Sequence, residues 1–268
     1  MRMETDVAAA RGSSADIYGS AGTRLINGRL ALQRVRLLPD PDALRWPEPA
    51  PNEHQLELLA AHLSRRPHTR YQRFVKPLVD RVAAGLLLVA LLPVLAVIAC
   101  TIAVTLGRPI LFGQTRTGKD GAPFSMLKFR TMRPDRRTHA EPFDGPDRRT
   151  THKSANDPRH TPIGRFLRKL SLDELPQLVN VLRGDMSLVG PRPEIAALTA
   201  DYLDWQQTRH TVKPGVTGLW QTTARGDGRL LHECVDLDLR YIRGLSFRTD
   251  VAILLRTPVA LLRNRGVI

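Results

Sequence analysis

The stretch VAAGLLLVALLPVLAVIACTIAVTL, residues 82–106, contains no charged side chain and decides the fold. A helix rises about 1.5 Å per residue, so this run is long enough to cross the roughly 30 Å hydrocarbon core of a bilayer. A core helix of a soluble protein usually carries a polar stripe on its outer face, and this run has none. We therefore predict a membrane-embedded helix in preference to a buried helix of a soluble core.

Pro93 lies near the middle of this run, and basic residues flank both ends. Proline removes a backbone donor and clashes with the preceding turn, so it bends or breaks a helix. Positive flanks favour the cytoplasmic side of a membrane, and a straight span satisfies only one of the two flanks. The pattern favours a re-entrant helix–break–helix over residues 71–107, with a kinked spanning helix as the alternative. The basic flanks are Arg73, Lys76 and Arg81 before the run and Arg108 and Arg116 after it.

The first 70 residues lack a regular hydrophobic pattern and are rich in Gly, Ser, Pro, Ala and Arg. We predict a disordered or linker tail over residues 1–70, with room for one short helix over Glu53–Leu63. The opening residues lack an apolar segment followed by a small-residue cleavage site, so we predict no signal peptide.

The chain of 268 residues carries 40 Lys and Arg against 26 Asp and Glu, a formal net charge of +14. A surplus of this size indicates an anionic partner, which is nucleic acid, anionic membrane lipid or a phosphorylated substrate. Nucleic acid fits poorly, because the basic residues are not interleaved with aromatic side chains and the uncharged run has no role there. Cys100 and Cys234 match neither a disulfide framework nor a zinc spacing, which indicates a reducing compartment.

Residues 108–268 have the pattern of one α+β domain that is mainly helical. Short apolar stretches separated by glycines in residues 107–132 predict a β-hairpin, and the polar residues 133–158 predict a loop. Helical patterns follow over 163–170, 194–208 and 230–243. The stretch 250–266 alternates apolar blocks with Arg and predicts a helix that lies either at a membrane interface or against the core.

The segment RKLSLDELPQ, residues 168–177, places two adjacent carboxylates, Asp173 and Glu174, at a predicted helix start. Ser171 and Glu174 have the spacing of a capping box, so one reading of these carboxylates is purely structural. The other reading is a phosphate site, because Arg168 and further basic residues surround a helix N-terminus. In such a site one carboxylate attacks phosphorus and the other holds Mg²⁺.

Two further basic segments have the same two readings, a solvated surface or a phosphate contact. Lys128 and Arg130 alternate in MLKFRTM, so in a strand they would face the same side. In GPRPE, Pro191 and Pro193 restrict the backbone around Arg192 and limit where its side chain reaches.

Three segments, KFRTM, DPRHTPIGRFLRKLSLDELPQLVNVLRGDMSLVGPRPE and RHTVKPGVTGLWQ, closely resemble the bacterial sugar transferase family. These proteins are the monotopic polyprenyl-phosphate phosphoglycosyl transferases. The resemblance runs from about Phe74 to the C-terminus. The chain is similar to the compact form of the family, which lacks the extra transmembrane helices of larger members. It implies a re-entrant membrane helix followed by a small catalytic domain with interfacial helices, over 108–268, on the cytoplasmic face of the bacterial cytoplasmic membrane.

The resemblance also implies an activity and roles for residues. Asp173 would attack the β-phosphorus of a UDP-sugar and release UMP. Polyprenyl (undecaprenyl) phosphate would then take the sugar phosphate from Asp173, which starts exopolysaccharide or glycoconjugate assembly. Glu174 would hold Mg²⁺. Contacts to phosphate or substrate would come from Arg168, Lys128, Arg130, Pro191, Arg192 and Pro193.

The alternative function is a non-catalytic membrane scaffold that uses the same basic surface to bind anionic lipid or a glycan-assembly partner. The joint presence of Asp173, Glu174 and Arg168 favours the enzyme, because a scaffold does not need these three residues. The chain departs from the family at the start of the membrane helix, where Pro77 follows Lys76 in place of the usual Lys-Arg.

Overall fold

The computed structural model describes residues 51–133, 159, 161–225 and 231–263. The described part is mainly helical, with two small two-stranded sheets and one long apolar helix, as the sequence predicts. Residues 1–50 and the predicted loop beyond Arg133 lie outside the described residues.

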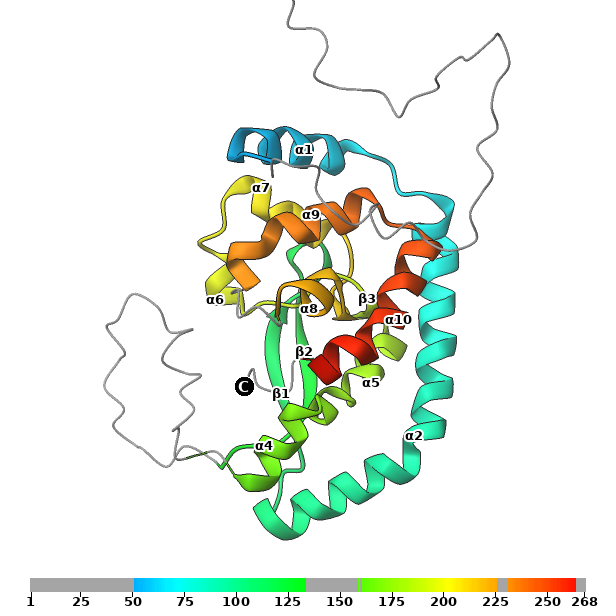
Figure 1. Cartoon of the computed structure of the whole chain (residues 1–268), viewed down its shortest axis with the longest axis vertical. Coiled ribbons are helices and arrows are strands. Elements are labelled where there is room, and N and C mark those ends of the chain that lie inside the picture. Colours follow the sequence, from blue (N-terminus) through cyan, green and yellow to red (C-terminus); the bar gives the residue numbers. More distant parts are fainter. Residues whose placement is uncertain (1–50, 134–158, 160, 226–230, 264–268) are drawn as a thin grey trace, which may run out of the picture. The chain divides into compact units, whose positions relative to one another are not determined.

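The apolar run forms helix α2, Lys76–Leu106, which continues directly from a π-helical turn over Tyr71–Val75. Pro93 lies inside this helix, and Figure 1 shows α2 as one helix that bends sharply along its length. The predicted break is therefore a bend in a continuous helix, because the missing N–H and the proline ring disturb only the turn around them. Tyr71–Leu106, 36 residues, is long and apolar enough to cross a membrane, and only 11% of its most apolar window is buried.

The predicted hairpin is confirmed. Strand β1, Leu111–Thr117, pairs antiparallel with β2, Pro123–Phe129, so that Leu111 lies opposite Phe129. A short 3₁₀ turn over Lys119–Gly121 joins the strands. A second, parallel pair joins β3, Ser187–Val189, to β4, Gly215–Thr217.

Helix α1, Glu53–Arg65, shows that the predicted tail is not wholly a linker. Asn52 and Gln55 form a capping box at its start, and Leu56, Ala60 and Leu63 are buried in the main core cluster. The helix predicted over Glu53–Leu63 is therefore present and belongs to the fold.

Helix α4, Pro162–Lys169, begins where its sequence pattern predicts, with the Thr161 side chain accepting from the Gly164 N–H at 3.0 Å. A Cβ on Gly164 would lie 1.9 Å from the Thr131 carbonyl oxygen, so only glycine lets α4 approach the end of the hairpin this closely. Leu167 then packs in a second core cluster with Ile98 and Ile102 of α2. Helix α5, Gln177–Arg183, follows in the chain and also packs against α2.

The amphipathic helix predicted over 194–208 is wrong. The chain instead forms two single turns, α6 over Ala196–Thr199 and α7 over Asp204–Gln207, followed by a 3₁₀ turn over Thr208–Thr211. Side-chain amides interrupt the helix: Gln207 donates to the Thr199 carbonyl at 2.6 Å, and Gln206 accepts from the Leu203 N–H at 2.9 Å. Backbone groups that a longer helix would satisfy are thus satisfied locally.

The C-terminal part contains α8, Leu219–Thr223, a 3₁₀ turn over Leu231–Cys234, α9, Val235–Arg243, and α10, Phe247–Arg263. Helix α10 buries Ala252 and Ile253 but exposes Leu255 and Leu262, so its outer face is partly apolar. Both cysteines are free thiols, as predicted from their spacing.

Candidate active site

The two adjacent carboxylates, named here the carboxylate pair, lie in a 3₁₀ turn over Leu172–Glu174, before α5 begins at Gln177. Ser171 has left-handed backbone angles, φ 53° and ψ 23°, and its side chain makes no capping hydrogen bond. The predicted capping box is therefore wrong, because an N-cap residue needs an extended backbone. Ser171 instead turns the chain between α4 and the carboxylate pair.

Glu174 is bound by two cations from distant segments. Lys128 Nζ, on β2, lies 2.8 Å from Glu174 Oε1. The guanidinium of Arg192 donates from Nη2 to Oε1 at 2.7 Å and from Nη1 to Oε2 at 3.2 Å. The Glu174 side chain is only 12% exposed, so these charge-assisted contacts are shielded from water and strengthened.

Asn180 holds β2 in place against α5. Its side chain, which is fully buried, accepts from the Leu127 N–H at 3.0 Å and donates to the Ser125 carbonyl at 2.8 Å. These contacts fix the strand that carries Lys128 relative to the helix that follows the carboxylate pair.

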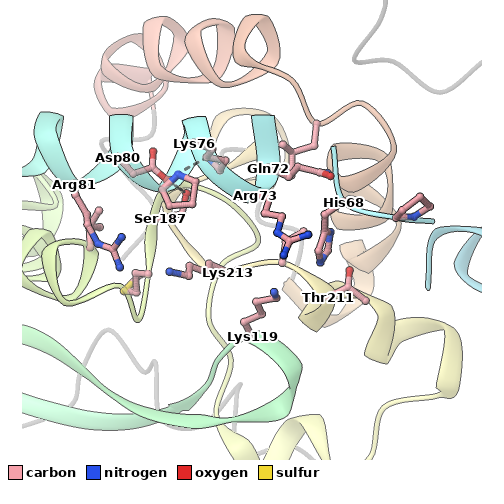
Figure 2. Close-up of a pocket in the computed structure, with 16 residues that line it drawn as sticks. His68, Gln72, Arg73, Lys76, Asp80, Arg81, Lys119, Ser187, Thr211 and Lys213 are labelled. Carbon is pink, nitrogen blue, oxygen red and sulfur yellow. Dashed lines mark hydrogen bonds and ion pairs between the residues drawn. The ribbon is translucent and has the colours of Figure 1, made fainter. Parts of the chain in front are cut away.

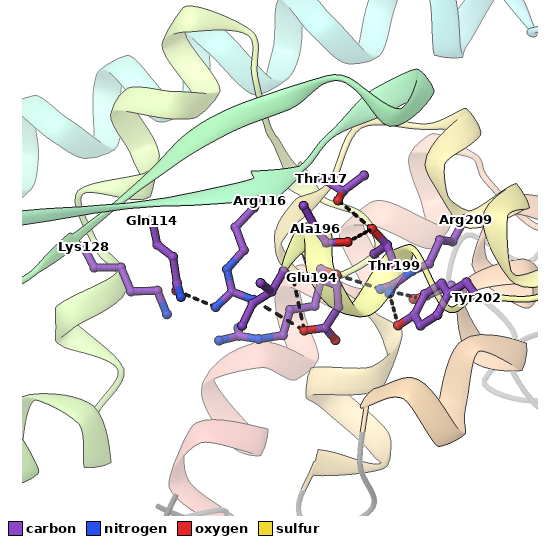
Figure 3. A network of polar contacts seen from close by, with 12 residues as sticks. Gln114, Arg116, Thr117, Lys128, Glu194, Ala196, Thr199, Tyr202 and Arg209 are labelled. Atoms are coloured by element: carbon purple, nitrogen blue, oxygen red, sulfur yellow. Dashed lines mark hydrogen bonds and ion pairs between the residues drawn. The ribbon is translucent and has the colours of Figure 1, made fainter. Parts of the chain in front are cut away.

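The segment around Arg192 is positioned by Arg209, which lies in the polar network of Figure 3. The Arg209 guanidinium donates to the Arg192 carbonyl at 2.7 Å, and it pairs with Asp238 of α9 at 2.8 Å. Both side chains of this pair are at most 2% exposed. The Pro191 carbonyl accepts from the Gly215 N–H at 2.8 Å, and Pro193 is buried. The backbone on both sides of Arg192 is thus fixed.

The two carboxyls have opposite pKa shifts. Burial, and then the charge of Glu174, raises the pKa of Asp173. Burial alone would raise the pKa of Glu174 too, but Arg192 and Lys128 outweigh it and hold that pKa well below its ordinary value. Asp173 is therefore the more basic carboxyl of the two, and Glu174 is a fixed negative charge.

Not every predicted residue lies at the carboxylate pair. Arg130 was expected beside Lys128, but its guanidinium donates to the carbonyls of Leu106, Gly107 and Arg108 at the end of α2. The reason is that β2 ends at Phe129, so the strand alternation no longer applies to Arg130. Arg168 lies half-buried in the last turn of α4, just before the turn that carries the pair.

Two arginines that sequence reasoning did not assign to the site lie within its electrostatic reach. Burial, and then Arg192, lowers the pKa of Arg116 to about 10, and the same two causes lower the pKa of Arg225. Arg116 donates to Gln114 at 2.7 Å and to Glu194 at 3.4 Å, as Figure 3 shows. Arg116 lies two residues after Gln114, so in a strand the two side chains face the same side, and this pattern could have indicated their contact. No local motif marks Arg225.

The oxygen atoms at the pair suit a hard cation. Among the described residues there is no group of three His, Cys, Asp or Glu side chains that could hold a metal alone. Mg²⁺, however, is usually held by one or two carboxylates together with substrate phosphates. Among the described residues, Glu174 Oε2 accepts one hydrogen bond, from Arg192, so it has acceptor capacity left for a cation.

An apolar cavity of about 350 Å³ is lined in part by Leu172, the residue that directly precedes the carboxylate pair in the sequence. It lies between the bend of α2 and α4. The lining consists of Pro93, Val94, Val97, Ile98, Thr101, Ile163, Phe166, Leu167 and Leu172.

Comparisons with known proteins show the family of this chain. A family model described as "Bacterial sugar transferase" matches residues 71–264. The chain is 40% identical over 198 residues to the UDP-glucose:undecaprenyl-phosphate glucose-1-phosphate transferase of Escherichia coli, covering 71% of this chain and 41% of that protein. It is 42% identical over 194 residues to the protein of the same name from Caulobacter vibrioides, covering 70% and 69%.

A third relative is the UDP-galactose-lipid carrier transferase of Erwinia amylovora, 38% identical over 220 residues, with 80% of this chain and 45% of that protein covered. The chain therefore spans less than half the length of the Escherichia coli and Erwinia amylovora relatives. The family model covers well over half of the chain, and it contains every residue of the site described above. The chain belongs to the bacterial sugar transferase family.

Proposed function

We propose that this protein transfers a sugar 1-phosphate from a UDP-sugar to polyprenyl phosphate, the reaction type that the names of its relatives describe. The observation that carries the proposal is a buried carboxyl, Asp173, beside a second carboxylate that two cations hold ionised. A buried carboxylate beside fixed cations is suited to attack a phosphorus atom whose charge those cations offset.

The proposed reaction has two steps. In the first, an Asp173 oxygen bonds to the β-phosphorus of the UDP-sugar, and the bond from that phosphorus to the bridging oxygen breaks, so that UMP leaves. In the second, a phosphate oxygen of the polyprenyl phosphate bonds to the same phosphorus, and the Asp173 carboxylate leaves. The product is a polyprenyl diphosphosugar, and Asp173 is regenerated as a carboxylate.

The surrounding residues have distinct proposed roles. Lys128 and Arg192 bind the phosphates and set the position of Glu174, while Arg168 contacts phosphate from the end of α4. Glu174 would hold Mg²⁺ through Oε2, and the ion would offset charge on the substrate phosphates when bound. Arg116 and Arg225 add positive charge around Arg192.

The membrane arrangement is part of the proposal. Helix α2 lies in the cytoplasmic membrane as a re-entrant helix that bends at Pro93, and the domain lies on the cytoplasmic face. The apolar cavity beside Leu172 then opens toward hydrocarbon, where the prenyl chain of the acceptor would lie. Its polar phosphate would reach the adjacent Asp173.

The test uses the purified full chain in detergent with undecaprenyl phosphate, Mg²⁺ and a panel of UDP-sugars that includes UDP-glucose and UDP-galactose. UMP release with one donor is expected, and Asp173→Asn abolishes both UMP release and the phosphosugar adduct on the protein. Asp201→Asn, which removes an exposed carboxylate, keeps the wild-type rate. Near-normal turnover by Asp173→Asn would contradict the assignment of Asp173 as the nucleophile. Absence of UMP release with every donor would favour the non-catalytic scaffold.

A further inference from the structure

The structure contains a cavity of about 500 Å³ whose lining includes neither Asp173 nor Glu174. We name it the basic pocket and define it by its cations Arg73, Arg81, Lys119 and Lys213. Figure 2 shows these side chains extending into one space from the start of α2, from the turn between β1 and β2, and from the segment before β4.

The positive charge of the basic pocket is largely uncompensated. Asp80 is the one carboxylate in the lining, and it is already engaged: it accepts from Ser187 Oγ at 2.6 Å and lies 3.5 Å from Lys76 Nζ. Lys119 lies 3.7 Å from Asp120, but within the described residues no carboxylate lies at ion-pair distance from Arg73, Arg81 or Lys213. The pocket therefore has a surplus of positive charge directed into a cavity.

Two of these cations lie close to each other beside Gly184, at the end of α5. A Cβ on Gly184 would lie 2.5 Å from Arg81 Nη2 and 3.4 Å from Lys213 Nζ. Burial, together with the charges of Arg81 and Lys119, lowers the pKa of Lys213. Like charges held this closely repel one another, and an anion placed between them relieves that cost.

The start of α2 has a cationic stripe beside an exposed apolar stripe, which suits a ligand with both a charged and an apolar part. Arg73, Pro77 and Arg81 are spaced four residues apart, so they form one stripe along the helix, and this stripe lines the pocket. The next stripe is apolar and faces outward. It consists of Phe74, Leu78 and Val82, which are 64%, 65% and 55% exposed.

The interior of the pocket is also partly apolar. Val181, Met186, Val212 and Leu245 contribute to its wall beside the cationic side chains. A ligand with a phosphate group and an adjoining hydrocarbon part matches both features, because its phosphate meets the arginine stripe and its chains meet the exposed apolar stripe.

We propose that the basic pocket binds the phosphate of an anionic phospholipid where α2 begins. This inference rests on the membrane placement of α2 in the proposed function, and it does not depend on the transfer chemistry. The bound headgroup would fix the depth and orientation of the first turns of α2, which also carry the buried Lys76–Asp250 pair at 2.6 Å.

The UDP-sugar donor fits the basic pocket less well. The carboxylate pair precedes the first residue of α5, whereas Val181 lies in the last turn of this helix and Met186 lies beyond its end. At about 1.5 Å per residue the two sites are separated by about 10 Å along α5. The lining also contains no Phe, Tyr or Trp side chain on which a uracil base would stack.

The experiment titrates the full chain in nonionic detergent with phosphatidylglycerol and follows bound lipid by native mass spectrometry. Phosphatidylcholine, inorganic phosphate and UDP form separate arms. Wild-type protein should bind phosphatidylglycerol saturably and in preference to the other three probes. The double variant Arg81→Gln/Lys213→Gln should lose about tenfold in affinity for each charge removed.

The matched control is Arg65→Gln/Arg243→Gln, which removes two exposed charges that do not line the pocket. It should bind phosphatidylglycerol as the wild type does. Melting temperatures check folding, and if the double variant is unfolded, Arg81→Gln alone gives the same comparison because that side chain is exposed.

Three results would overturn the proposal. These are equal phosphatidylglycerol binding by the wild type and the double variant, equal binding of phosphatidylcholine or inorganic phosphate, and displacement of the lipid by UDP with UDP affinity lost in the double variant. The last result would assign the pocket to the sugar donor. Asp173→Asn should retain lipid binding, so failure of the transfer assay and failure of the lipid site are separate outcomes.

Discussion

The guanidinium of Arg192 and the carboxylate of Glu174 are joined by two parallel hydrogen bonds, at 2.7 and 3.2 Å. This geometry belongs to arginine and cannot be reproduced by a lysine ammonium. Arg192 lies between two prolines, so the position of its backbone is set before the side chain meets Glu174.

Arg192→Gln should lower kcat/KM about a hundredfold, because it removes a fixed cation from a site where charge is transferred. Arg192→Lys keeps the charge but loses the second hydrogen bond, so its kcat/KM should lie between those of the wild type and Arg192→Gln. The measurement is initial rate against UDP-sugar concentration. Arg183→Gln, an exposed arginine at the end of α5, is the matched control, and equal losses in both variants would contradict a local role.

The acid side of the pH–rate profile should report Asp173. The carboxyl must be ionised to attack phosphorus, and burial and Glu174 raise its pKa, so the rate falls at a higher pH than for an ordinary carboxyl. Lys128 lowers this pKa, so Lys128→Met should shift the acid limb of kcat/KM to higher pH. Lys169→Met should leave the limb in place. A limb that does not move with Lys128→Met argues against Asp173 as the titrating group.

The Arg209–Asp238 pair should show the behaviour of a buried ion pair. Arg209→Met or Asp238→Asn alone leaves one buried group unmatched and should cost about 3 kcal/mol of stability. The double variant Arg209→Met/Asp238→Leu removes both polar groups and should recover part of that loss. Thermal unfolding of the detergent-solubilised protein gives the comparison. If the double variant is less stable than both single variants, the expected recovery is contradicted, and the ion pair stabilises the fold more than apolar side chains do in its place.

The re-entrant arrangement predicts that both sides of α2 lie on the cytoplasmic face. Ala61→Cys in α1 and Ala200→Cys after α6, both exposed, are made in a Cys100→Ser background. In intact cells a membrane-impermeant maleimide should label neither position, and after permeabilisation it should label both. Labelling of one position alone in intact cells would show that α2 spans the membrane.

Features encoded locally were predictable from the sequence. The uncharged run of α2, the glycine-marked hairpin and the helical pattern of α4 each depend on neighbouring residues, and each is present. The same local reasoning proved wrong at Ser171, where a capping spacing coincides with a left-handed backbone angle. The competing partner of Glu174 is Arg192, 18 residues away, and a local pattern does not contain it.

The remaining parts of the site depend on contacts between distant segments. The guanidinium of Arg130 could bind a phosphate, yet it donates hydrogen bonds to the carbonyl groups at the end of α2. Arg209 begins the segment RHTVKPGVTGLWQ, but that segment gives no sign of Asp238 in α9, and only packing brings the two side chains together behind Arg192. Sequence patterns thus identify the chemical groups, while the supporting contacts follow from the tertiary fold.

Asn180 has a consequence for how the site responds to salt. Its amide joins β2 to α5 through neutral hydrogen bonds to the Leu127 and Ser125 backbone, in a fully buried position. The backbone of the strand that carries Lys128 is therefore positioned by contacts that do not depend on the attraction between Lys128 and Glu174. Raising the ionic strength will screen the attraction of the site for anionic substrates but leave the arrangement of its charges unchanged.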